Sequence, residues 1–197
     1  MKNPLILLKF FIPFILACTN PFSTREPEQP DAGGVQFIPP RTPEVVLQNL
    51  KNAVLEQNIE NYLRNLSDPA RNPRDFAFIP DQSVATENPG VFDTWARENE
   101  RFYFSQLRAF VPNDSLRLLT FRNVQTTISA DSAVFIENYT LRVHHTRQSQ
   151  EIPALFAGQA RFFMNTDNIG DWSIHRWEDL PSDSGQSWSR LKAFFGN

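Results

Sequence analysis

Two side chains of this 197-residue chain, Glu137 and Tyr139, have the types and the spacing for acid–base chemistry. They lie in an alternating stretch, and residues two apart on a strand point to the same face of a sheet. Burial on that face would raise the pKa of the Glu137 carboxyl group and suit it to act as a general base or acid. Arg176 would anchor an anionic or carbonyl group, so these three residues are the catalytic candidates.

Small residues opposite Glu137 and Tyr139 predict a space above them. A hairpin that turns near Gln148–Ser149 aligns the more apolar faces of two strands, the criterion that normally sets register. Its pairs would be Val143 with Ala154, Leu141 with Phe156, Tyr139 with Gly158, Glu137 with Ala160, and Phe135 with Phe162. Gly158 and Ala160 are too small to fill the space over the sheet, so a cavity is expected unless the covering helices fill it.

The next hairpin, near Asp167–Asn168, decides what else reaches this cavity. If Trp172 and Ile174 face the core together, which is the better hydrophobic choice, the alternation also turns Arg176 inward. The predicted ligand pocket then consists of Glu137, Tyr139, Gly158, Ala160, Arg176 and Glu178. A pairing shifted by one residue would instead turn inward His175, Trp177 and Asp179, and the sequence leaves both registers open.

A purely structural role is the alternative for Glu137 and Arg176. They would form a buried ion pair that closes the domain, because buried carboxylates usually persist by being paired. The sequence favours this role for that reason. It also offers no histidine–acid pair facing the predicted cavity, which favours a non-enzymatic domain.

Metal and cofactor sites are not expected. His144 and His145 are adjacent and would point to opposite faces of a strand, and His175 is isolated in sequence. The sequence contains no nucleophile elbow, phosphate loop or dinucleotide fingerprint. We therefore predict no metal and no cofactor.

The elements that must position these residues begin with helices. Apolar residues at spacings of three and four predict one helix from Thr42, a break at Asn58 and a second short helix up to Leu66. A third helix is expected to begin at Asp93 or Thr94. Its buried face would consist of Trp95, Phe102, Leu107 and Phe110.

Strands make up the second half of the chain. A short strand is expected at 75–79, followed by a loop at 80–91. From Ser115 the period changes to two, which predicts strands at 115–128, 133–145, 152–164 and 171–180 and a short capping segment at 187–195. The fold class is therefore α+β, with helices packed on a curved antiparallel sheet.

This order of elements resembles the nuclear transport factor 2-like superfamily of cystatin-like α+β domains, which includes polyketide cyclase-like and ketosteroid isomerase-like proteins. The resemblance covers Thr42 to Leu180 and rests on the opening VVLQNLKNAVLEQNIENYLRNLSD and on the W-x-I-x-x-W pattern at Trp172, Ile174 and Trp177. It implies a cone-shaped domain. The superfamily includes isomerases, dehydratases, cyclases and members that only bind or dimerise, and none of its catalytic sets matches here residue by residue.

The N-terminus has the features of an export signal. Lys2 and Lys9 precede an apolar run too short to span a bilayer, and Ile15-Leu16-Ala17-Cys18 resembles a bacterial lipobox. The resemblance implies cleavage before Cys18, the only cysteine, which would then carry lipid such as palmitate and bind the membrane. The alternatives are an ordinary secretory signal and a membrane helix that is never cut.

Three regions are expected: a signal peptide at 1–17, a flexible tether with the lipidated Cys18 at 18–41, and a single α+β cone domain at 42–197. The tether is rich in proline and polar residues, and we expect it to be disordered, although Val35, Phe37 and Ile38 offer a way to dock. The lipid would place the chain in the bacterial cell envelope. By resemblance to sorting in enteric bacteria, Thr19 after the cysteine favours the outer membrane.

The net charge and the outward-facing strand residues indicate which partners the chain could bind. A formal net charge of −3 argues against nucleic-acid binding. The outward set is unusually apolar, which indicates a homodimer or protein-partner surface unless the segment around Trp188 covers it. This set consists of Val134, Ile136, Thr140, Leu155, Phe163 and Trp177. We therefore expect an anchored, non-enzymatic domain that binds a small-molecule ligand or a protein partner. The alternative is an envelope enzyme of the isomerase, dehydratase or hydrolase type.

Overall fold

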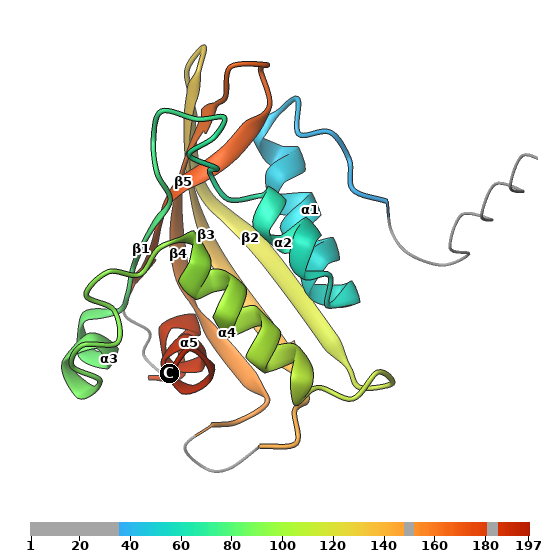
Figure 1. The fold of residues 1–197 in the computed structure, drawn as a ribbon, viewed down its shortest axis with the longest axis vertical. Helices are drawn as coiled ribbons and strands as arrows, with labels where there is room; N and C mark the ends of the chain where they lie inside the picture. Colours follow the sequence, from blue (N-terminus) through green and yellow to red (C-terminus); the bar gives the residue numbers. More distant parts are fainter. Residues whose placement is uncertain (1–35, 148–151, 181–184) are drawn as a thin grey trace, which may run out of the picture. The chain divides into compact units, whose positions relative to one another are not determined.

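The computed structural model describes residues 36–147, 152–180 and 185–197. The elements in chain order are α1 (Pro43–Glu56), α2 (Ile59–Arg64), β1 (Ala77–Ile79), α3 (Gln82–Glu87), α4 (Arg97–Ala109), β2 (Arg117–Ile128), β3 (Ser132–Val143), β4 (Leu155–Thr166), β5 (Trp172–Leu180) and α5 (Trp188–Phe195). Within these residues the strands form one five-stranded sheet in the order β1-β5-β4-β3-β2 (Figure 1). Only β1 runs parallel to its neighbour, β5. The predicted α+β class is confirmed.

The first two helices form as their sequence signals predict. Pro43 occupies the first turn of α1, and the helix ends where Gln57 adopts a left-handed conformation with φ 54°. The Asn58 side chain then caps α2 by accepting a hydrogen bond from the Asn61 N–H at 3.0 Å. The predicted break at Asn58 is therefore confirmed, and it lets Leu50 and Leu63 both face the core.

The stretch from Asp81 to Ala109 differs from expectation. A short helix, α3, lies within the predicted loop, where the Asp81 side chain caps it through the Ser83 N–H at 2.9 Å. Helix α4 begins at Arg97 and buries Glu100, Tyr103, Phe104 and Leu107. Phe102, predicted to be buried, is 46% exposed because it lies off this helix face. The buried face of α4 instead includes Glu100, a residue that the charge pattern places on the surface, and this orientation of the helix turns Phe102 outward.

The register between β3 and β4 is the predicted one. Glu137 pairs with Ala160 and Tyr139 pairs with Gly158, and the same alignment runs to Phe135 opposite Phe162. The Val143 N–H donates to the Ala154 carbonyl oxygen at 2.8 Å. The alternation of buried residues on both strands leaves only this alignment with one apolar face.

The β4–β5 pairing contains a bulge that combines the two predicted registers. Ile174 lies opposite Met164, but Arg176 lies opposite Phe163, so His175 is an extra residue with no partner in the ladder. A bulge of this kind reverses the alternation of the strand beyond it. Trp172 and Ile174 are therefore buried before the bulge, and Trp177 is buried after it.

Helix α5 covers the inner face of the sheet, the face that carries Tyr139 and Trp177, and lies beside β4 (Figure 1). The Trp188 ring packs edge-on against Trp177 with 4.5 Å between ring centroids, and against Tyr139 at 5.5 Å. The segment expected as a possible cover for the outer face thus packs on the opposite face.

Residues 37–41, which we call the strap, pack against the domain although the sequence places them in the tether. Ile38 exchanges two hydrogen bonds with the Asn49 side chain, at 3.1 and 2.6 Å, and the Trp172 N–H donates to the Pro40 carbonyl oxygen at 2.8 Å. The packed part of the chain therefore begins before Thr42. Cys18 and the tether residues up to 35 lie outside the described residues. Among the residues that are described, no helix is long and apolar enough to cross a membrane.

Candidate functional site

Glu137 occupies the inner face of β3, as predicted, and is only 3% exposed. One of its carboxylate oxygens accepts a hydrogen bond of 2.6 Å from the Asn123 amide, which also donates to Thr126 at 2.8 Å. The β2 strand has a register shift between Asn123 and Gln125, and this irregularity brings Asn123 and Thr126 to the same place. The second carboxylate oxygen of Glu137 has no hydrogen-bond partner within the described part of the chain.

An open cleft of about 530 Å³ borders Glu137. It lies between α1 and the strands β2 and β3, and its walls combine apolar and polar side chains. The lining residues are Glu44, Val45, Leu47, Gln48, Lys51, Phe121, Asn123, Thr126, Phe135 and Glu137. A cleft of this volume is within the range of small-molecule sites.

Burial raises the pKa of the Glu137 carboxyl group above its ordinary value. The hydrogen bond from Asn123 and the charge of Lys51 oppose this effect but do not cancel it. Glu137 therefore holds a proton to a higher pH than a free glutamate does, while it remains in reach of a ligand in the cleft.

Tyr139 shares the inner face with Glu137 but does not line the cleft. Its buried hydroxyl donates to Asp179 at 2.8 Å and accepts from the Trp188 N–H at 2.7 Å. Burial raises its pKa well above the ordinary value for tyrosine. A Cβ atom added to Gly158 would lie 2.6 Å from this hydroxyl oxygen. The cavity predicted over Gly158 and Ala160 is therefore absent from the described structure, because Tyr139 and Trp188 fill that space.

Arg176 and Glu178 do not join Glu137. The bulge at His175 turns Arg176 to the outer face, where its side chain is 52% exposed and contacts Glu178 at 2.5 Å. Glu178 also pairs with Arg161 at 3.0 Å. Neither the predicted pocket around Arg176 nor the predicted ion pair between Arg176 and Glu137 is formed.

The interior under α5 holds an ion pair that sequence reasoning missed. Lys192 and Glu100 are both fully buried, and the Lys192 ammonium group contacts the Glu100 carboxylate. Glu100 also accepts hydrogen bonds from Tyr62 at 2.8 Å and from the Trp95 indole at 2.9 Å. Burial lowers the pKa of Lys192 to about 8, although Glu100 acts in the opposite direction. Glu100 stands among exposed charges in the sequence, so no local signal marked it as buried.

Asp179 forms the second buried acid of the interior. It accepts two hydrogen bonds from Ser189, from the N–H at 2.6 Å and from the hydroxyl at 2.5 Å, in addition to the bond from Tyr139. Burial raises its pKa, and these hydrogen bonds together with Lys192 oppose that shift. Because each carboxylate oxygen is occupied by a protein donor, this acid fixes α5 to the sheet.

The histidines are separated in the structure. His175 lies 2.9 Å from the Arg74 guanidinium group, and burial lowers its pKa to about 4. His145 is buried near the Pro153 carbonyl oxygen, at 3.3 Å. In the described ranges, no group of three or more His, Cys, Asp or Glu residues could hold a metal ion.

Comparisons with known proteins identify the fold. No protein-family model matches the chain, and no curated protein matches it in sequence. A conserved protein from Planctomyces limnophilus is similar in structure, with 15% identity, a TM-score of 0.52 and coverage of 70% of this chain and 91% of that one. A protein of unknown function from Mycobacterium tuberculosis has 12% identity, a TM-score of 0.52 and coverage of 78% and 90%.

A nuclear transport factor 2-like protein from Cytophaga hutchinsonii also matches, with 14% identity, a TM-score of 0.49 and coverage of 70% and 93%. The α+β fold of this chain is therefore shared with solved structures at TM-scores of 0.52. At such low identity these likenesses establish the fold alone, so any statement about function must come from the site.

Proposed function

We propose that this chain is a binding protein, anchored by lipid in a bacterial envelope, whose domain holds a small amphipathic ligand in the cleft at Glu137. The observation that carries the proposal is a contrast within the inner face of the sheet. Its centre is filled by α5, Tyr139 and the buried ion pair, whereas the end near α1 is open. Within the described part of the chain, this open end offers a cleft of about 530 Å³ that a small molecule can enter.

The lining of the cleft indicates the chemistry of the ligand. Leu47, Phe121 and Phe135 provide apolar walls, and the Glu137 carboxylate oxygen that Asn123 does not contact provides a hydrogen-bond acceptor. A few placed polar groups in an apolar cleft are typical of sites that orient a small molecule. The ligand would pack an apolar body against the rings and donate a hydrogen bond to Glu137.

Binding is favoured over catalysis by the positions of the three catalytic candidates. Glu137 lines the cleft, Tyr139 is committed to Asp179 and Trp188, and Arg176 lies on the outer face. Acid–base catalysis usually needs several groups within hydrogen-bond reach of the reacting atoms. Only one of the three is placed to meet a ligand.

Native mass spectrometry of the compact unit from Gly34 to Asn197 tests the proposal. We expect a small-molecule adduct that survives mild purification and is lost in the Glu137→Gln variant. The matched control is Glu44→Gln, which removes an exposed carboxylate from the rim of the same cleft. A wild-type unit without an adduct, which also fails to bind any member of a panel of amphipathic compounds, would contradict the proposal.

An envelope enzyme of the isomerase, dehydratase or hydrolase type is the second candidate. It is favoured by one observation, the raised pKa of Glu137 beside an open cleft, which suits general acid–base work. The same variant separates the two functions once a ligand is known. An enzyme converts the ligand and stops doing so in Glu137→Gln, whereas a binding protein returns it unchanged.

The anchor is proposed from the sequence at Ile15–Cys18, which resembles a lipobox. Mass spectrometry of the mature N-terminus tests it, and a diacylglyceryl or palmitoyl mass on Cys18 is the expected result. An unmodified Cys18 or an intact Met1 would remove the lipid anchor. Fractionation of the envelope would test the outer-membrane location, which rests on Thr19.

A homodimer or a protein partner on the outer sheet face is also proposed. Val134, Ile136 and Phe163 are half-buried on that face and Leu155 is 44% exposed, while Trp177, assigned to it by sequence, lies inside. Because α5 packs on the inner face, it does not cover the outer one. The mass of the native assembly gives the oligomeric state in the same experiment as the adduct.

A further inference from the structure

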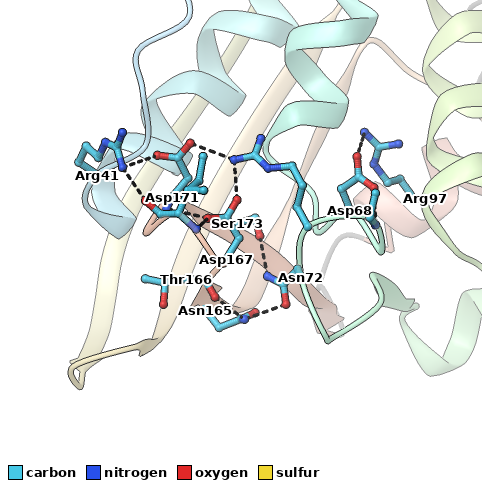
Figure 2. A network of polar contacts seen from close by, with 12 residues as sticks. Arg41, Asp68, Asn72, Arg97, Asn165, Thr166, Asp167, Asp171 and Ser173 are labelled. Atoms are coloured by element: carbon cyan, nitrogen blue, oxygen red, sulfur yellow. Dashed lines mark hydrogen bonds and ion pairs between the residues drawn. The ribbon is translucent and has the colours of Figure 1, made fainter.

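A second, smaller pocket of about 70 Å³ lies where the strap meets the β4–β5 turn. It shares no lining residue with the cleft at Glu137. Phe37 and Pro40 of the strap form one wall, and Asn72 and Ser173 contribute an amide and a hydroxyl. Its charged lining residues are Arg64, Arg71, Arg97, Asp68, Asp167 and Asp171. Figure 2 shows how most of these polar side chains are connected.

Two of the three aspartates are already neutralised by arginines. Asp167 contacts Arg71 at 2.5 Å and accepts hydrogen bonds from the N–H groups of Ile169 and Asp171, each at 3.0 Å. Asp171 lies 3.2 Å from both Arg41 and Arg71 (Figure 2). In this half of the site two guanidinium groups therefore balance two carboxylates.

In the other half of this pocket, Arg64 and Arg97 have N–H donors that are not paired with an acceptor among the described residues. The Arg97 guanidinium nitrogen Nη2 lies 3.8 Å from Asp68 Oδ2, beyond hydrogen-bond distance, and the buried Nε of Arg97 has no hydrogen-bond partner among the described residues. Arg64 stacks on the Phe37 ring at 3.7 Å, and it forms no ion pair in the described part of the chain. The stacked guanidinium group of Arg64 keeps its in-plane N–H donors free. The buried Nε–H donor of Arg97 is costly to leave without an acceptor.

We propose that this pocket binds the phosphate group of a small anionic ligand through Arg64 and Arg97. With the two balanced pairs set aside, Arg64 and Arg97 face only Asp68, so this half carries a net positive charge. Planar guanidinium groups recognise phosphate oxygens by paired hydrogen bonds, and the Asn72 amide and the Ser173 hydroxyl lie in the same lining. The pocket admits one phosphate-sized group, so the rest of the ligand stays outside it.

Two sources present this chemistry, free inorganic phosphate and the phosphate ester of a phospholipid headgroup. Isothermal titration calorimetry on the full chain in a neutral sugar detergent can separate them, with inorganic phosphate and glycerol phosphate as the titrants at constant ionic strength. Both titrants are expected to bind. Tighter binding of glycerol phosphate would assign a headgroup-type ligand, and binding of inorganic phosphate alone would assign free phosphate.

Single substitutions locate the binding. Arg64→Gln and Arg97→Gln should each weaken binding about tenfold, the loss that one charge-assisted hydrogen bond produces. Arg97→Lys, which keeps the charge but loses the planar fork, should fall between wild type and Arg97→Gln. The matched control is Arg142→Gln on the outer face of β3, an exposed arginine outside the pocket, and it should bind as wild type does.

The proposal is overturned if neither titrant binds at millimolar concentration, or if Arg142→Gln weakens binding as much as the two pocket variants do. Arg97 is partly buried, so Arg97→Gln could lower stability. In that case Arg64→Gln decides, because Arg64 is exposed and its replacement should leave the melting temperature unchanged.

Discussion

The interior under α5 and the cleft at Glu137 both bury carboxylates on the inner side of one sheet, but they differ in how those carboxylates are satisfied. Glu100 contacts Lys192 and accepts hydrogen bonds from Tyr62 and Trp95. Asp179 accepts hydrogen bonds from Tyr139 and Ser189. Glu137 meets one amide and an open cleft. Burial alone therefore does not distinguish these acids, whereas the free oxygen beside open space makes Glu137 the candidate for ligand binding.

This difference also separates the filled centre of the inner face from the open end that is proposed to bind a ligand. Helix α5 brings Trp188, Ser189 and Lys192 over the centre of the sheet, and their polar atoms are bonded to residues from α4, β3 and β5. A substitution in this network leaves the bonded polar atoms of its neighbours without their partners, so it should affect folding. Among the described residues, the cleft between α1 and β2 has no element of this kind above it, so one substitution there should act on binding rather than on folding.

The largest expected effect is the loss of the buried ion pair. Lys192→Met leaves the Glu100 carboxylate buried without its cation, which costs about 3–5 kcal/mol of unfolding free energy. Urea denaturation measures the change. The matched control is Lys51→Met on the rim of the cleft, which should change stability by less than about 0.5 kcal/mol. Equal losses in the two variants would abolish the distinction between the two regions.

Gly158→Ala should have an intermediate effect on the interior. The added Cβ atom would meet the Tyr139 hydroxyl oxygen at 2.6 Å, so Tyr139 must shift away from Asp179 and Trp188. Such overpacking costs about 1–3 kcal/mol. In a Tyr139→Phe background the clash with the hydroxyl is gone, and the further loss from Gly158→Ala should be smaller. A thermal melt of the four proteins gives this comparison, and an equal loss in both backgrounds would show that the hydroxyl is not the cause.

The two regions also differ in how far their sequence predicted them. The register of β3 on β4 could be derived because the alternation of Phe135, Glu137 and Tyr139 fits only one alignment with an apolar face. The sequence therefore places Glu137 on the correct face, but the space predicted over Gly158 and Ala160 is filled, and the cleft at Glu137 lies instead between α1 and the strands β2 and β3. The bulge at His175 could not be derived, because one extra residue lets Trp172 and Ile174 of one predicted register and Trp177 of the other all be buried. The bulge turns Arg176 to the outer face.

The interior was hidden for a different reason. Glu100 and Lys192 are separated by 92 residues, and each stands in a local pattern that is typical of a surface helix. Their burial depends on each other, because neither charge is tolerated inside without its partner. No local signal predicts that kind of pair. The strap was similarly ambiguous, since its docking depends on Asn49 and on the β4–β5 turn rather than on its own composition.

A smaller effect is expected at His175, on the boundary where the strand reverses its alternation. Burial and the charges of Arg74 and Arg176 lower its folded-state pKa to about 4, below its value in the unfolded chain. The unfolded state then binds more protons between pH 6.5 and 4, so stability falls as the pH drops through this window. His175→Gln should therefore lose less unfolding free energy than wild type does between pH 7 and pH 5. Because the ring is partly exposed, the difference should be less than about 1 kcal/mol. Urea titrations at both pH values measure it, and an identical pH dependence in variant and wild type would contradict the shift.

The smallest effect on stability should come from the acid of the cleft itself. Burial raises the pKa of Glu137, so the folded state binds more protons than the unfolded state as the pH rises above the ordinary glutamate range. Ionisation of Glu137 therefore reduces stability with rising pH, the opposite sign to that of a paired acid. Glu137→Gln removes this loss and can keep the hydrogen bond from Asn123, so the variant should be between zero and about 1 kcal/mol more stable than wild type at pH 7. Urea denaturation of both proteins at pH 5 and pH 7 tests the sign. If Glu137→Gln is instead destabilised to the extent expected for Lys192→Met, Glu137 belongs to the closed interior and the cleft loses its claim to be a binding site.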